Sequence, residues 1–187
     1  MAERHSFQKE VTDLMSSLEG NPIDVCIQCG TCSGSCPAVE YMDHSPRQII
    51  AMIRAEMKEQ VVNSDTIWCC SSCYNCTVRC PKDIKITKMM YALKRYCIWK
   101  HAYSKGAIGP AFSRRFVGIV VKTGKSYEPG LAPTFMFRYG MMGVIDNMMM
   151  GMSLLQKGRM AIVPKTVKRI ENFRRVLNRI IPVGVKE

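Results

Sequence analysis

The chain has 187 residues, 47% of them hydrophobic and 22% charged, and 27 Lys and Arg against 15 Asp and Glu give a formal net charge of +12. No uncharged apolar run reaches about 18 residues, so we expect no membrane span. The first residues, Met1 to His5, lack the apolar segment of a secretory signal. The ten cysteines are therefore expected in a reducing cytoplasm, as metal ligands rather than disulfides.

Helices are predicted before, between and after two cysteine loops in the first hundred residues. Apolar residues at helical spacing predict a helix from Phe7 to Leu18, ended by Gly20-Asn21-Pro22. Ser45 and Pro46 suit the N-cap and first position of a second helix. Its apolar face comprises Ile49, Ile50, Ile53 and Met57. Asn63-Ser64-Asp65 ends this segment and caps a brief turn that carries Ile67 and Trp68.

A longer helix is predicted after residue 83, with Asp83 as its cap and Gly106 at its close. Its apolar face comprises Ile86, Met89, Met90, Leu93, Tyr96 and Cys97. Beyond it, Pro110 to Val121 is expected to be helical, and the glycines and prolines between Lys122 and Pro133 predict a loop.

The C-terminal part contains two further apolar segments. Phe135 to Leu155 is rich in methionine, which favours an adaptable core or partner-facing helix over one lying on a membrane surface. In the last segment, basic residues lie opposite an apolar stripe of Val167, Ile170, Phe173, Leu177 and Ile180. These charges are either a solvated face or a surface that docks to a partner.

Two cysteine runs share one spacing. The first comprises Cys26, Cys29, Cys32 and Cys36, followed by Pro37, and the second comprises Cys70, Cys73, Cys76 and Cys80, followed by Pro81. Gaps of two, two and three residues before a proline are typical of [4Fe–4S] ferredoxins, in which three cysteines bind one cluster and the fourth binds the other. The sequence therefore predicts two [4Fe–4S] clusters with crossed ligand sets. The sets are Cys26, Cys29, Cys32 with Cys80, and Cys70, Cys73, Cys76 with Cys36.

Zinc and disulfides explain the cysteines less well. Zinc sites use two well-separated pairs, which leaves a triple unexplained, and disulfide frameworks suit short secreted chains. Cys69 breaks the spacing and Cys97 lies on an apolar helical face, so neither is expected to be a ligand. Two clusters would carry about −2 each, which part of the basic charge offsets, and the remainder favours an acidic partner. Arg79, beside Cys80, is expected either near the first cluster, where a cation would raise the reduction potential, or facing solvent in an ion pair.

The paired runs, the helical spacer and the run from Cys70 to Pro81 resemble the helical ferredoxin family. That family includes the C-terminal half of succinate dehydrogenase iron–sulfur subunits and the C subunit of heterodisulfide reductases. We expect no N-terminal [2Fe–2S] domain and find no CCG-type cysteine repeat, so the layout is most similar to the C subunit of the soluble methanogen type. The predicted fold is mostly α, with a helical ferredoxin domain at residues 1–106 and a helical, partner-docking extension at 107–187.

That resemblance implies an electron relay without an active site of its own. In the family, a flavin-carrying subunit sends single electrons through the C subunit to a catalytic subunit, sometimes in a hydrogenase-linked complex. The catalytic subunit reduces the mixed disulfide of coenzyme M and coenzyme B during methanogenesis. A relay in another sulfur-metabolism or hydrogenase complex is an alternative. A basic iron–sulfur protein that binds nucleic acid is a further one, but no interleaving of aromatic and basic residues supports it.

Overall fold

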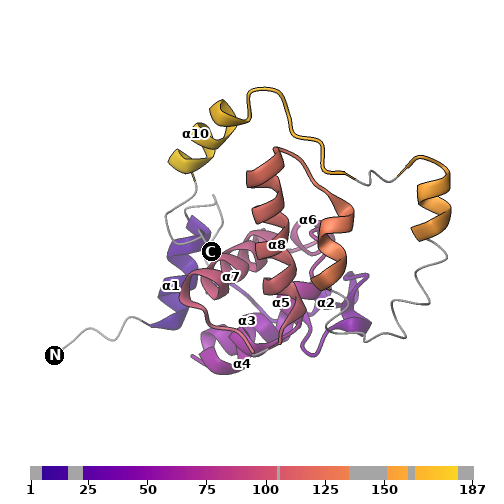
Figure 1. Ribbon diagram of the computed structural model, residues 1–187. Coiled ribbons are helices and arrows are strands. Elements are labelled where there is room, and N and C mark those ends of the chain that lie inside the picture. The colour runs from indigo at the N-terminus through magenta and orange to yellow at the C-terminus, as the bar shows by residue number, and fades with distance from the viewer. Residues whose placement is uncertain (1–5, 17–22, 105, 135–150, 160–162, 181–187) are drawn as a thin grey trace. The chain divides into compact units, whose positions relative to one another are not determined.

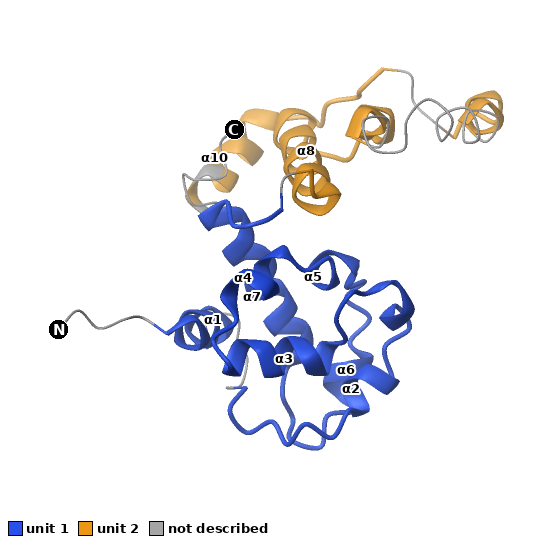
Figure 2. Ribbon diagram, turned by 90° about the horizontal axis from the view of Figure 1, so that it is seen from below, with its two compact units in different colours: residues 1–105 blue, residues 106–187 orange. Residues whose placement is uncertain are grey.

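The regular structure is helical wherever it is described, and no strand occurs among those residues, so the predicted mostly α class is confirmed. The computed structural model describes all residues except 1–5, 17–22, 105, 135–150, 160–162 and 181–187 (Figure 1). The chain divides into two compact units, Met1–Lys105 and Gly106–Glu187 (Figure 2). We call them unit 1 and unit 2.

Unit 1 is a set of short helices around one longer helix. Its core consists of buried apolar side chains from α1, α3, α4, α5 and α7, and α1 packs against α7. All six predicted apolar residues of α7 are buried, so this expectation is confirmed. The elements are α1 (Phe7–Ser16), α2 (Thr31–Gly34), η1 (Val39–Tyr41), α3 (Pro46–Arg54), α4 (Lys58–Asn63), α5 (Thr66–Cys69), α6 (Asn75–Val78) and α7 (Ile86–Lys100).

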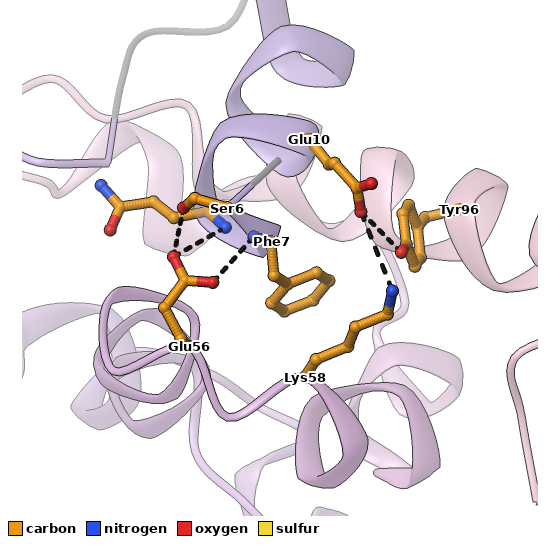
Figure 3. A network of polar contacts seen from close by, with 7 residues as sticks. Ser6, Phe7, Glu10, Glu56, Lys58 and Tyr96 are labelled. Atoms are coloured by element: carbon orange, nitrogen blue, oxygen red, sulfur yellow. Dashed lines mark hydrogen bonds and ion pairs between the residues drawn. The ribbon is translucent and has the colours of Figure 1, made fainter. Parts of the chain in front are cut away.

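The helix that Ser45 and Pro46 begin is shorter than predicted. Ser45 and Gln48 form the expected capping box, but α3 ends at Arg54 and the chain turns at Glu56, whose φ is 59°. Met57 is therefore outside the helix and 38% exposed, so its predicted place in the apolar face was wrong. The physical reason is a long-range contact. The Glu56 carboxylate accepts hydrogen bonds from the Phe7 and Gln8 N–H groups and from the Ser6 hydroxyl, which satisfies the start of α1 (Figure 3).

A second polar contact joins α1 to the rest of unit 1. The Tyr96 hydroxyl of α7 donates a hydrogen bond to Glu10 at 2.7 Å, and the Lys58 ammonium lies 3.9 Å from the same carboxylate (Figure 3). The ammonium also lies 5.3 Å from the centre of the Tyr96 ring. Helix α1 is thus held at its first turn and along its side.

Both predicted ends of α7 need correction. Asp83 does not cap it: the cap position is Lys85, which makes no side-chain cap bond, and Asp83 instead pairs with the Lys85 ammonium at 2.6 Å. The helix ends at Lys100, before Gly106, because His101 adopts a left-handed conformation and its N–H closes the last turn.

Unit 2 contains α8 (Ile108–Thr123), η2 (Glu128–Leu131), a helical segment at 151–156 and α10 (Ile170–Ile180). The predicted loop at 122–133 thus includes a helical turn. The methionine-rich segment lies outside the described residues up to position 150. Pro110 is the one fully buried residue among those described in this unit.

Helices α8 and α10 are joined by a small set of contacts. The Arg174 guanidinium donates to the Val121 and Lys122 carbonyls at the end of α8, and also pairs with Glu171. The Val167 N–H donates to the Thr123 carbonyl at 2.9 Å. Part of the predicted C-terminal stripe therefore packs on the chain's own helix, with Val167, Ile170, Phe173 and Leu177 partly buried.

Among the described residues, every helix is too short or too polar to cross a lipid bilayer.

Candidate iron–sulfur site

Four cysteines line each of two cavities in unit 1. The first cavity, of about 340 Å³ including space open to solvent, is lined by Cys26, Cys29, Cys32 and Cys80. The second, of about 350 Å³ on the same measure, is lined by Cys36, Cys70, Cys73 and Cys76. Each cavity thus combines the first three cysteines of one run with the fourth cysteine of the other. Contact between the short helices α2 and α6 accompanies this exchange.

The two cysteine loops have matching backbones. Gln28 and Ser72, each two residues after the first cysteine of its run, have φ of 58° and 59°. Gly30 and Tyr74, two residues further on, are also left-handed, with φ of 82° and 64°. Glycine adopts this conformation without steric cost, whereas tyrosine does so at a cost of about 1–3 kcal/mol. Two left-handed residues curl each loop, so that successive cysteines face one cavity.

Short helices complete each run. In the first, the N–H groups of Ser33 and Gly34 donate to the Gly30 carbonyl at 2.9 and 3.0 Å. In the second, those of Thr77 and Val78 donate to the Tyr74 carbonyl, both at 3.0 Å. These turns are α2 and α6, and they bring the fourth cysteine of each run to the opposite cavity.

The cysteines of each cavity differ in exposure. Cys29 and Cys73 are exposed, whereas Cys32 is buried and Cys76 is partly buried. Burial raises the pKa of the Cys32 and Cys76 thiols, because a buried thiolate loses its hydration. The Thr31 hydroxyl, 3.4 Å from the Cys29 sulfur, lowers the pKa of that thiol. A bound cation would therefore stabilise the thiolate forms of Cys32 and Cys76.

This donor set fits a [4Fe–4S] group in each cavity. Four thiols surround each space, and four thiolates are what such a group requires. A single metal ion fits less well, because within the described residues no three His, Cys, Asp or Glu side chains are placed so that they could hold one ion together. When bound, the group would supply one-electron redox chemistry, and the chain would supply the thiolates and partial exclusion of water.

The two remaining cysteines line neither cavity. Cys69 is partly buried, and its thiol donates to the Tyr41 carbonyl at 3.4 Å. Burial raises the pKa of Cys69, and nearby Asp65 and Asp43 add to the effect. Cys97 is buried in the core, and burial raises its pKa to about 12. Both therefore behave as packed thiols.

Three charged residues near the site were missed by sequence reasoning. Arg47 and Lys82 line the first cavity, whereas Arg79, which was expected near the first cluster, lines neither cavity; all three side chains are exposed. Asp43 accepts hydrogen bonds from the Ser64 and Thr66 hydroxyls, both at 2.7 Å, and so fixes the turn before the second run. Lys82 could have been found from its place after Cys80-Pro81, but no local signal marks Arg47 or Asp43.

The class of protein follows from these cysteine loops and from a family comparison. Residues 22–84 match the family described as 4Fe-4S dicluster domain, and they include both cysteine runs. This part of the chain is similar to iron–sulfur dicluster domains.

The relatives are subunits of oxidoreductases. One is the C subunit of the H(2):CoB-CoM heterodisulfide,ferredoxin reductase of Methanothermobacter marburgensis, 32% identical over 120 residues, which is 64% of this chain and 61% of the relative. Another is the C iron-sulfur subunit of the CoB--CoM heterodisulfide reductase of Methanopyrus kandleri, 32% identical over 63% of this chain and 60% of the relative. The C subunit of the Ferredoxin:CoB-CoM heterodisulfide reductase of Methanosarcina acetivorans is 41% identical over 41% of this chain and 30% of its own.

The predicted resemblance to the C subunit of heterodisulfide reductases is therefore confirmed. The chain spans about three-fifths of the length of the first two relatives named.

Proposed function

We propose that the first cavity holds one [4Fe–4S] cluster on Cys26, Cys29, Cys32 and Cys80, and that the second holds another on Cys70, Cys73, Cys76 and Cys36. The observation that carries this is the convergence of four thiols on each cavity from two separate runs. The matching left-handed loops support the same assignment from the backbone.

The test is a serine exchange in the anaerobically purified chain. The wild type should contain about eight irons. Cys80→Ser should damage the cluster on Cys26, Cys29 and Cys32, although Cys80 belongs to the second run. Cys69→Ser is the matched control, because Cys69 adjoins Cys70 but lines neither cavity, and its iron content should stay unchanged. Damage confined to the cluster on Cys70, Cys73 and Cys76 would contradict the crossed sets.

We infer that the chain relays single electrons as a subunit of a heterodisulfide reductase. Its partners would be a flavin-carrying subunit and the catalytic subunit that reduces the coenzyme B–coenzyme M heterodisulfide, in the cytoplasm. The relatives' names and the dicluster domain support this role. The exposed cysteines Cys29 and Cys73 lie one at each cavity, so each cluster would have its own edge facing solvent or a partner.

The proposed relay predicts that this chain accepts electrons and that the catalytic subunit reduces the heterodisulfide, and the two activities can be measured separately. With a chemical one-electron donor, the chain alone should be reduced but should leave the heterodisulfide intact. Adding the catalytic subunit should restore turnover, and Cys80→Ser should suppress it. Heterodisulfide reduction by the chain alone would contradict the relay.

We further propose that unit 2 is the part that docks to the partner subunits. Fourteen Lys and Arg against four Asp and Glu give residues 106–187 a formal net charge of +10, which favours an acidic partner surface. The sparse burial within its described residues supports the same role.

The docking test must separate charge from folding. Lys168, Arg175 and Arg179 are exposed, so exchanging all three for glutamine should weaken assembly and its salt dependence while the helices persist. Arg174→Gln is a contrasting variant: it removes a charge but also breaks the contact with the end of α8, so it should disturb the folding of unit 2. Undiminished assembly of the triple variant would end the docking proposal.

A further inference from the structure

The two cavities are built from corresponding positions, which allows a residue-by-residue comparison. Helix α3 contributes Arg47 and Ile50 to the first cavity, and α7 contributes Thr87 and Met90, each forty residues later, to the second. The cavities therefore have the same scaffold and differ in the side chains placed on it.

One pair of cations is matched between the sites. The Arg54 guanidinium donates to the Cys26 carbonyl at 2.9 Å, and the Lys94 ammonium, again forty residues later, donates to the Cys70 carbonyl at 3.1 Å. Each binds the first cysteine of its run. Each cation should change the reduction potential of its own site by a similar amount, so this pair does not make the two potentials differ.

Two cations of the first cavity have no counterpart. Arg47 corresponds to Thr87, a neutral hydroxyl. Lys82 follows Cys80-Pro81, and the corresponding residue after Cys36-Pro37 is Ala38. Both side chains are exposed, and among the described residues neither forms an ion pair, so only solvent and salt screen their charges. The lining of the second cavity contains no charged side chain among the described residues.

Hydrogen bonds to the cysteine sulfurs are also more numerous at the first cavity than at the second. In the first cavity, the Gln28 amide donates to the Cys26 sulfur at 3.4 Å, and the Thr31 hydroxyl lies 3.4 Å from the Cys29 sulfur. In the second, the Thr87 hydroxyl lies 3.7 Å from the Cys76 sulfur. Cations and hydrogen bonds near the sulfurs both stabilise the reduced form, which carries one more negative charge.

We propose that Arg47 and Lys82 give the first cavity the higher reduction potential, so that a single electron entering the chain comes to rest there. This inference rests on the two proposed clusters. The step is a one-electron transfer: the second site is oxidised, the first is reduced, and no proton or bond is exchanged. A one-electron donor, such as a reduced flavin or iron–sulfur group, supplies the electron. The second site is then the entry side and the first site is the exit side.

The experiment is a redox titration of the full chain, followed by electron paramagnetic resonance under anaerobic conditions. The signal that Cys80→Ser alters identifies the first site. Arg47→Thr and Lys82→Ala place the second site's residues in the first, and together they should lower the first potential and leave the second in place. Arg79→Gln is the matched control, since Arg79 lines neither cavity, and it should move neither potential.

A reciprocal variant tests the inference in the other direction. Ala38→Lys adds to the second site the cation that Lys82 gives to the first, and should raise the second potential. Ala38→Lys tests the effect of a nearby cation on the potential even if the Arg47→Thr, Lys82→Ala double variant loses iron. An unchanged pair of potentials in the iron-replete variants, or a first potential below the second in the wild type, would overturn the proposal. A wild type with much less than about eight irons would instead overturn the proposed clusters.

Discussion

Units 1 and 2 differ in how they are stabilised and charged. The buried apolar core lies in unit 1, whereas Pro110 is the one buried residue described in unit 2. Thirteen Lys and Arg against eleven Asp and Glu give unit 1 a formal net charge of +2, compared with +10 for unit 2. Two clusters of about −2 each would make unit 1 slightly acidic. Most of the basic excess therefore belongs to unit 2, which fits a role in association, and the +2 of unit 1 would offset part of the charge of the clusters.

Truncating buried and exposed side chains of equal size should give the largest contrast. Ile53 is fully buried in unit 1, and Leu155 is 37% exposed in unit 2. Ile53→Ala should cost about 2–5 kcal/mol, since it removes apolar contacts and leaves a cavity. Leu155→Ala should cost less than about 1 kcal/mol. Anaerobic urea titration followed by circular dichroism measures both, and equal losses would contradict the contrast in burial.

Two glycines, Gly118 within α8 and Gly124 at its C-cap, test whether unit 2 nevertheless has specific packing. Gly124 has φ of 81°, and a Cβ there would overlap one methyl of Val167 and lie 3.0 Å from the other. Gly124→Ala should therefore cost about 2 kcal/mol and expose the Val167 N–H to hydrogen exchange. Gly118→Ala meets nothing within 4 Å and should stabilise the helix by about 0.5–1 kcal/mol. Similar behaviour of the two variants would mean that Val167 does not pack against Gly124.

The Asp43 carboxylate offers a polar test in unit 1. Burial opposes its ionisation, but hydrogen bonds from Thr66, Ser64 and two backbone N–H groups outweigh burial and lower the pKa of Asp43 to about 2. This stabilisation is present above about pH 4 and is lost as the pH falls toward 2. Asp43→Asn should cost about 1–2 kcal/mol at neutral pH, allowing for partial exposure. Asp65→Asn, on the same turn, is the control and should be nearly neutral in the same unfolding titration.

The smallest expected change in the free energy of unfolding comes from the contact at the start of α1. The Ser6 hydroxyl and the Phe7 and Gln8 N–H groups hold the pKa of Glu56 below its ordinary value, so this contact weakens as the pH falls through the acidic range. Glu56→Gln should cost about 0.5–1 kcal/mol, as loss of a helix cap does. Hydrogen exchange at the Phe7 and Gln8 amides should accelerate, while exchange in α7 stays unchanged. Glu59→Gln in α4 is the matched control, and equal acceleration in both variants would argue against the cap.

The sequence alone determined the features that depend on local spacing. The gaps between cysteines require tight loops, and the 3.6-residue period placed the buried face of α7, because both are properties of consecutive residues. The helix bounds were predicted less well. Glu56 ends α3 because it caps α1, and Asp83 pairs with Lys85 instead of capping α7. The Glu56 contact joins residues 49 positions apart, so neighbouring residues do not predict it, whereas the Asp83–Lys85 pair is local and was overlooked.

Only the tertiary structure decided what surrounds each set of cysteines. Arg47 lies on α3, more than thirty residues from Cys80, yet both line one cavity, whereas Arg79, adjacent to Cys80, lines neither. Likewise, Arg174 reaches the end of α8 across more than fifty residues of chain. Electrostatic effects depend on distance in space, and a compact fold brings together groups whose separation along the chain says little about it.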